Sequence, residues 1–239
     1  LKPFRACATH KQDLLTNCPE CHKDVNYIAS ESITHCACGF DFRTAKTELA
    51  SQQDYILSAS LLNKAFLDDN PLCSDTDLST KLSSVAWFQR RKEVYNFESE
   101  EIINYFQHWP KSLLFELNEI KNQAKMKLLN GFNKTPFNFV FRQLITDSFS
   151  LSRHQSEPHF ITIFVLNFLF ELVDENPKGN EPNIADMLLT ISETSAILST
   201  SYEQVYRLYE TGILKLAIRP KIHQKLRSND AAFYLRQVI

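Results

Sequence analysis

Four cysteines in two short pairs constrain this chain more than any other feature of its sequence. Cys18-Pro-Glu-Cys21 places two thiols three positions apart, and Cys36-Ala-Cys38 supplies a second pair after fourteen intervening residues. A short turn directs both sulfurs of such a pair to one side, and four thiolates complete a tetrahedral zinc site without an open position. The pattern predicts one closed structural Zn²⁺ site with Cys18, Cys21, Cys36 and Cys38 as its ligands.

The segment between the two pairs is expected to form a small hairpin, as in a zinc ribbon. Its apolar residues are Val25, Tyr27, Ile28 and Ile33. Gly39, directly after the second pair, permits the tight turn behind it. Five of the six cysteines fall within the first 38 residues, which favours metal binding in a reducing compartment over a disulfide scaffold. We therefore expect a cytoplasmic protein.

A further half-site, Cys7-Ala-Thr-His10, has no unused partner pair downstream. A rival grouping joins Cys7 and His10 to the first cysteine pair in one Cys₃His site, and leaves the second pair with only His22 or His35 as partners. We favour two sites, the first of which combines Cys7 and His10 with ligands that precede Leu1. The site of Cys7 and His10, which would add a second zinc ion to that of the four cysteines, is incomplete in this chain. The simpler alternative for this pair is a free thiol beside a surface histidine.

Composition excludes several classes of protein. The net charge of −2 gives no whole-chain argument for nucleic-acid binding, so any basic surface must be local. Only four glycines occur, and neither GxGxxG nor GxxxxGK[ST] can be written from them. Since no run of alternating strands is present either, the fold is expected to be mainly α.

The chain divides into three zones. We expect a zinc-ribbon module over residues 1–48, a helical domain over 50–178 and a helix-turn-helix domain over 184–239. The polar stretch 174–182 has two prolines, one glycine and two asparagines, the composition of a linker. The most apolar segment, Phe160 to Val173, is shorter than the roughly twenty residues of a bilayer span. It is expected to be a buried helix, and no membrane partner is expected.

Apolar spacing and helix-terminal residues predict six helices in the middle zone. They run through Tyr55 to Phe66, Leu78 to Phe88, Ser99 to Phe106, Pro110 to Leu128, Pro136 to Phe149 and Pro158 to Val173.

The N-terminal motifs resemble those of the TniQ/TnsD family of bacterial transposon proteins. The resemblance rests on Cys7-x-x-His10-x-x-x-Leu14-Leu15-x-x-Cys18-Pro19-x-Cys21 and on Cys36-x-Cys38-Gly39-Phe40-Asp41-x-Arg43. A further segment, Phe106-x-x-Trp109-Pro110-x-x-Leu113, is similar to one in the helical region of that family. In the family a preceding CPxC pair, absent from this chain, completes the first finger with the Cys-x-x-His.

This resemblance implies a targeting adaptor without catalytic activity. TniQ-like proteins select a transposition target, either as DNA or through a CRISPR effector complex. They then recruit a AAA+ ATPase regulator that engages the transposase.

The C-terminal zone has the pattern of a helix-turn-helix. A first helix is expected over 191–198 with Ser192 as a plausible N-cap, followed by a turn at 199–201 and a second helix over 202–209 that Gly212 closes. The inward positions are Ala196, Leu198, Val205, Leu208, Ile213 and Leu214. The outward positions include Tyr202, Gln204 and Arg207.

These outward side chains suit a nucleic-acid or partner-binding face, because Gln and Arg near the start of a second helix can reach base edges. A basic arm for phosphate contacts follows and consists of Lys215, Arg219, Lys221, Lys225 and Arg227. A closing helix is expected over 230–238, as in the winged units of MerR-like and excisionase-like proteins, which this zone resembles. Protein docking is the alternative, because Glu203 and Glu210 dilute the positive field. It becomes the favoured role in the CRISPR-linked branch of the family.

Catalysis is not expected. Neither GxSxG nor HExxH is present, and the paired carboxylates Asp68-Asp69 and Glu100-Glu101 sit where acidic residues complement helix dipoles. A zinc-ribbon and helix-turn-helix transcription regulator, bound to an operator as a homodimer, is the alternative to the transposition adaptor.

Overall fold

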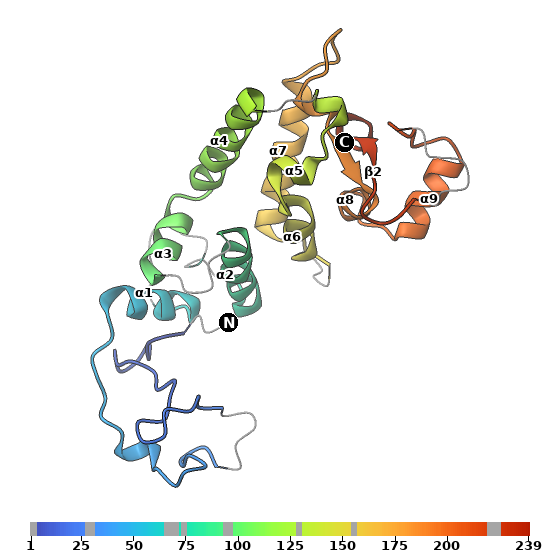
Figure 1. The fold of residues 1–239 in the computed structure, drawn as a ribbon. Coiled ribbons are helices and arrows are strands. Elements are labelled where there is room, and N and C mark those ends of the chain that lie inside the picture. Colours follow the sequence, from blue (N-terminus) through green and yellow to red (C-terminus); the bar gives the residue numbers. More distant parts are fainter. Residues whose placement is uncertain are drawn as a thin grey trace. The chain divides into compact units, whose positions relative to one another are not determined.

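The computed structural model describes most of the chain and shows a mainly helical protein (Figure 1). The described residues are 4–26, 32–64, 72, 76–92, 98–127, 131–153, 157–218 and 226–239. They form two compact units, one of Leu1–Gln89 with Val94–Trp109 and one of Arg90–Glu93 with Pro110–Ile239. The three zones expected from the sequence were defined by motifs and differ from this division into two units. As domains, the three zones stay a prediction.

Three helices of the first unit lie close to their expected positions. They are α1 (Gln52–Leu61), α2 (Leu78–Lys92) and α3 (Ser99–Gln107). Ser51 caps α1, because its side chain accepts a hydrogen bond from the Asp54 backbone N–H. The helix ends at Leu61, and Phe66, which was expected to extend it, lies outside the described residues.

Aromatic side chains of α2 and α3 form the core of this unit. Trp87 and Phe106 are fully buried. The ring centroids of Phe88 and Tyr105 lie 4.9 Å apart, and Trp109 stacks on Phe106 at 6.0 Å. Two of the residues quoted for the family resemblance, Phe106 and Trp109, therefore contribute to a hydrophobic core.

The second unit begins with α4 (Lys111–Lys127), the 3₁₀ turn η2 (Phe132–Lys134), α5 (Phe137–Phe141) and α6 (Leu144–Ser150). The prediction of one helix from Pro136 to Phe149 is wrong, because Arg142 adopts φ 54° and ψ −139° and ends α5. The break gives the two pieces different partners. Helix α5 packs on α4, whereas α6 packs on α7 and α8.

Helix α7 (Phe160–Asp174) confirms the expected buried helix. Its side chains Ile161, Val165, Leu169 and Leu172 are almost fully buried. Among the helices of the described ranges, none combines the length and apolar character needed to cross a bilayer.

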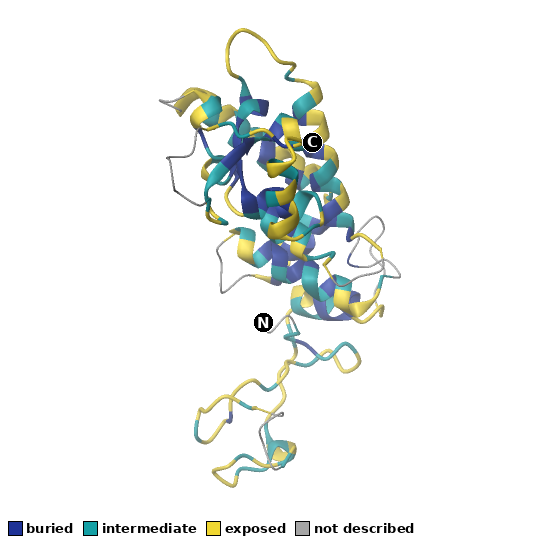
Figure 2. Cartoon of the chain, turned by 90° about the vertical axis from the view of Figure 1, so that its right-hand side faces the viewer, coloured by how far each residue is buried: buried dark blue, intermediate teal, exposed yellow. Residues whose placement is uncertain are grey.

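The C-terminal part of this unit contains a two-stranded sheet as well as helices. After η3 (Ile184–Asp186) come β1 (Leu188–Thr190), α8 (Ile191–Ile197), α9 (Tyr202–Glu210), β2 (Ala231–Tyr234) and α10 (Leu235–Val238). The strands are antiparallel, with Leu188 opposite Tyr234 and Leu189 opposite Phe233. They appear as a buried layer in Figure 2.

The prediction of a closing helix over 230–238 is therefore only partly right. The residues from Ala231 to Tyr234 form the strand, and only Leu235–Val238 is helical. The reason lies in burial, because Ala232 and Phe233 are both buried against the cluster that holds α8 and α9.

Candidate metal centre and candidate nucleic-acid interface

The four cysteine sulfurs of Cys18, Cys21, Cys36 and Cys38 form one cluster, in which all lie within 4.8 Å of one another. Cys18 Sγ lies 3.7 Å from Cys38 Sγ, and Cys21 Sγ lies 3.6 Å from Cys36 Sγ. A tetrahedral zinc ion with Zn–S bonds of about 2.3 Å has sulfurs about 3.8 Å apart along each edge. The cluster therefore fits a four-cysteine zinc site and is far too wide for disulfides.

The first pair is positioned by a tight backbone turn. Cys18 N–H donates to the Lys23 carbonyl, and His22 N–H donates to the Cys18 carbonyl, both at 2.9 Å. His22 takes a positive φ of 57°, which closes the turn, and Asn17 and Asp24 pair across its base. This geometry turns the sulfurs of the first pair to the same side.

The second pair sits on a turn one residue shorter. Cys36 N–H donates to the Phe40 carbonyl, and Gly39 N–H donates back to Cys36, both at 2.9 Å. Gly39 has φ 95°, a conformation that glycine adopts without strain, as expected from the sequence. Asp41, at the base of the turn, accepts two hydrogen bonds from the Arg43 guanidinium, from Nε to Oδ1 and from Nη2 to Oδ2.

Thiols this close cannot all ionise unless a cation lies among them. For Cys18, burial raises the pKa, but backbone N–H groups of Cys21 and Glu20 and the neighbouring thiols outweigh it and lower the pKa to about 7. For Cys38, the Phe40 N–H lowers the pKa, yet burial and the other three thiols together raise it to about 12. A divalent cation would remove this repulsion, so the electrostatics also suit a metal.

The module around the cluster has almost no hydrophobic core. Within residues 4–26 and 32–50 only Ala6 and Cys18 are buried, and Figure 2 shows this region almost without buried surface. Ile33, expected in a ribbon hairpin, is 73% exposed, and Tyr27 and Ile28 lie outside the described residues. Small segments with so little apolar burial are commonly stabilised by cross-links such as a structural metal.

The Cys7 segment repeats the backbone of the first turn eleven residues earlier. Cys7 N–H donates to the Gln12 carbonyl at 2.8 Å, and Lys11 N–H donates to Cys7 at 2.9 Å. Lys11 has the same φ of 57° as His22. The stretch that begins at Cys7 therefore has the same backbone turn as the stretch that begins at Cys18.

Cys7 and His10 face each other, with Sγ 3.3 Å from Nδ1. The backbone N–H groups of His10 and Thr9, followed by the His10 ring, lower the pKa of the Cys7 thiol to about 7. Neither residue joins the four-cysteine cluster. Within the described part of the chain, the structure thus groups the two cysteine pairs with each other and does not form the rival Cys₃His grouping.

The helix-turn-helix is present as α8 and α9, joined by a short turn. The N-cap of α8 is Thr190 and not Ser192, since Thr190 Oγ1 accepts from the Glu193 N–H and the Glu193 carboxylate accepts from the Thr190 N–H. This capping box has the sequence signature Thr-x-x-Glu, the signal that would have placed the cap correctly. Ser201 caps α9.

A small core holds the two helices against the sheet. Its buried members are Ile191, Val205, Leu214, Ala232 and Phe233, with Leu198 and Leu208 packed at its edge. The expected inward position of Ile213 is wrong, because its side chain is 69% exposed. Gly212, with φ 76°, ends α9 in the left-handed conformation, and Leu214, which was also expected to point inward, is buried as predicted.

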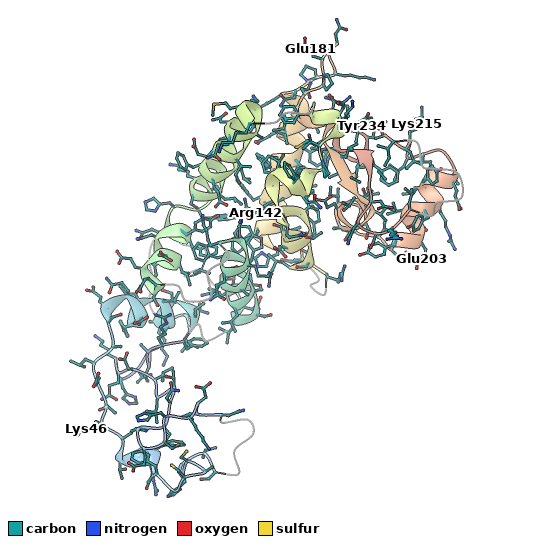
Figure 3. The ribbon with its side chains drawn as sticks, in the orientation of Figure 1. Lys46, Arg142, Glu181, Glu203, Lys215 and Tyr234 are labelled. Atoms are coloured by element: carbon teal, nitrogen blue, oxygen red, sulfur yellow. The ribbon has the colours of Figure 1, made fainter. Side chains whose placement is uncertain are left out.

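The outward face of α9 is as expected from the sequence. Tyr202, Gln204 and Arg207 are all exposed. Glu203 and Glu210 are exposed as well, so the face has mixed charge. Glu203 lies in the first turn of α9, and its side chain points outward (Figure 3).

Two of the five basic-arm residues can be placed. Lys215 and Arg227 are exposed, on either side of a segment that leads to β2. Lys215 follows the end of α9 (Figure 3). Arg219, Lys221 and Lys225 lie outside the described residues.

Sequence reasoning did not find strand β1, and it did not find a groove beside the turn of the helix-turn-helix. The groove lies between α6, the start of α7 and the turn before α9, and has a volume of about 500 Å³.

No protein-family model matches this chain, and no curated protein matches it at a significant level.

Proposed function

We propose that this chain is a targeting adaptor without catalytic activity that contacts DNA through its C-terminal helix-turn-helix. The observation that carries the proposal is α9, which Val205 anchors in the core while Tyr202, Gln204 and Arg207 stay exposed. Such a second helix presents side chains of the type that hydrogen-bond to base edges in a major groove. In this proposal the sheet of β1 and β2, together with the exposed Lys215 and Arg227, makes the unit a winged helix-turn-helix.

The zinc site has a structural part in this proposal. Four sulfurs occupy every position of a tetrahedral ion and leave none for water or substrate. Its role is to hold the turns around Cys18 and Cys36 in one arrangement, so that the module can present a surface to a partner.

The partners follow from the TniQ/TnsD resemblance, which rests on the sequence motifs. They are target DNA or a CRISPR effector complex on one side, and a AAA+ transposition regulator on the other. A reducing cytoplasmic setting suits the five cysteines that form no disulfide among the described residues.

Direct DNA binding is tested by a mobility-shift titration of the zinc-loaded chain with a short duplex of random sequence, over a series of NaCl concentrations. We expect binding that weakens linearly on a log–log plot of affinity against salt. Arg207→Ala should weaken binding, whereas Lys178→Ala, a change at an exposed lysine in the linker, should not. A folded chain that retains no duplex even at low salt would reject this form of the function.

The alternative function, a transcription regulator that binds an operator as a homodimer, needs no ATPase. Purification of the tagged chain from its native host separates the two. Recovery of a AAA+ protein favours the adaptor, whereas a dimer that selects one duplex sequence without an ATPase favours the regulator.

A further inference from the structure

The groove beside the helix-turn-helix has the chemistry of a donor-rich surface. Its described lining residues come from α6, the loop after α6, α7, α8, the turn before α9 and the first residue of α9. Hydroxyl side chains dominate the lining, and they include Thr162, Ser192, Ser199 and Tyr202. Arg153 is the one charged residue among the described lining residues, and it is exposed. Such a surface favours an anionic partner.

Several of these hydroxyls hydrogen-bond within the protein. Thr162 Oγ1 donates to the Ser148 carbonyl, and Ser195 Oγ donates to the Thr200 carbonyl. The Ser192 and Tyr202 oxygens lie 3.2 Å apart. Only one of them donates within that pair, so the other has a proton for a ligand.

The groove adjoins the proposed base-contacting face. Tyr202 is the first residue of α9 and lines the groove, while Gln204 and Arg207 are exposed further along the same helix. In helix-turn-helix complexes the second helix enters the major groove, and the first helix crosses the backbone beside it. A duplex contacted by α9 would therefore bring a phosphate strand past the turn that lines this groove.

We propose that the groove binds the sugar-phosphate backbone of the duplex that α9 contacts, with Arg153 as the cationic partner of a phosphate. This inference rests on the proposed DNA-binding function and extends it. It assigns part of the interface to the loop after α6 and the start of α7, which the sequence pattern of the helix-turn-helix does not include.

A matched pair of substitutions at Ser199 tests the position of the backbone. Ser199 has φ 49°, and both Asn and Asp accept this left-handed conformation. Ser199→Asp adds a carboxylate to the groove, whereas Ser199→Asn adds a neutral group of the same shape. With a short random-sequence duplex we expect Ser199→Asp to bind about tenfold more weakly than Ser199→Asn, because phosphates and a carboxylate repel each other.

Arg153→Gln tests the cationic contact. The slope of log affinity against log salt is negative, and loss of one phosphate contact should make it less steep by about one. Lys178→Gln is the control that should leave the slope unchanged. Circular dichroism of each variant verifies that it is folded.

The outcomes separate this inference from the function on which it rests. If Arg207→Ala weakens duplex binding while Arg153→Gln and Ser199→Asp do not, the groove inference is wrong and the DNA-binding function stands. If the wild-type chain retains no duplex, both are wrong. If Ser199→Asp leaves duplex binding intact but abolishes binding to a purified protein partner, the groove is a protein-docking surface and the inference is likewise overturned.

Discussion

The Arg236 guanidinium of α10 pairs with the Asp186 carboxylate of η3, with Nε 2.6 Å from Oδ1. Both side chains are largely buried, at 14% and 15% exposed. The same guanidinium donates through Nη2 to the Asn183 side chain at 2.8 Å and to the Asn176 carbonyl at 3.1 Å. One residue of α10 thereby ties this helix to η3 and to the polar stretch 174–182 before it.

Removal of this guanidinium should destabilise the second unit. We expect Arg236→Ala to lower the free energy of unfolding by about 2 kcal/mol or more, because the Asp186 carboxylate keeps its partial burial without a partner. Guanidinium chloride unfolding measures the loss. Arg236→Lys, which keeps the charge but not the two-point geometry, should recover only part of it. An unchanged midpoint for Arg236→Ala would show that the ion pair contributes nothing.

The four-cysteine cluster predicts a defined metal content. The purified chain should contain one zinc ion held by the four-cysteine cluster, and Cys18→Ser should lose it, because Cys18 is the fully buried ligand. Cys7→Ser is the matched control, since Cys7 lies outside the cluster and its change should leave that ion in place. Elemental analysis measures zinc per chain, and cobalt substitution reports tetrahedral thiolate coordination. Equal zinc loss in both variants would contradict the assignment of ligands.

The elements that sequence reasoning found share one property, which is that local spacing determines them. The turns around Cys18 and Cys36 need only a few neighbouring residues, and α9 needs only its N-cap Ser201, a periodic apolar side and Gly212. Each cysteine pair could be predicted for the same reason, because its own turn brings its two sulfurs together.

The features that sequence reasoning missed depend on residues far apart in the chain. Strand β1 is only three residues long, and Leu189 faces Phe233 across the sheet, more than forty positions away. The groove joins side chains of α6 and α7 to the turn at Ser199. No local pattern contains such information. The helix break at Arg142 is a third feature that sequence reasoning missed. The reason is that the apolar periodicity continues through the point where the helix breaks.

Substitutions at Arg142 test that break. In a continuous helix Ala is more stable than Gly by about 1 kcal/mol. At φ 54° and ψ −139° the order should reverse, because only Gly adopts this region without strain. We therefore expect Arg142→Gly to be more stable than Arg142→Ala by about 1 kcal/mol in chemical unfolding. The opposite order would favour the single helix expected from the sequence.

Glu193 predicts a pH dependence of the helix-turn-helix. Burial raises the pKa of this carboxyl group from 4.5 to about 7, although the hydrogen bonds that it accepts from Thr190 lower it. The folded state therefore binds a proton more tightly than the unfolded state does. The resulting stabilisation is complete below the unfolded pKa and is lost as the pH rises through about 7, so stability should fall between about pH 5 and pH 8.

Glu193→Gln isolates this effect, because glutamine can accept the same Thr190 hydrogen bonds in a capping box but cannot ionise. At low pH the variant and the wild type should have similar stability. Above pH 7 the variant should be more stable, by up to about 2 kcal/mol, since the wild type then has to bury a carboxylate charge. Thermal unfolding of both proteins across this pH range measures the difference. Curves that stay parallel would mean that the carboxyl group does not titrate in this window, and the Thr190 cap would then hold an ionised Glu193 without loss of stability.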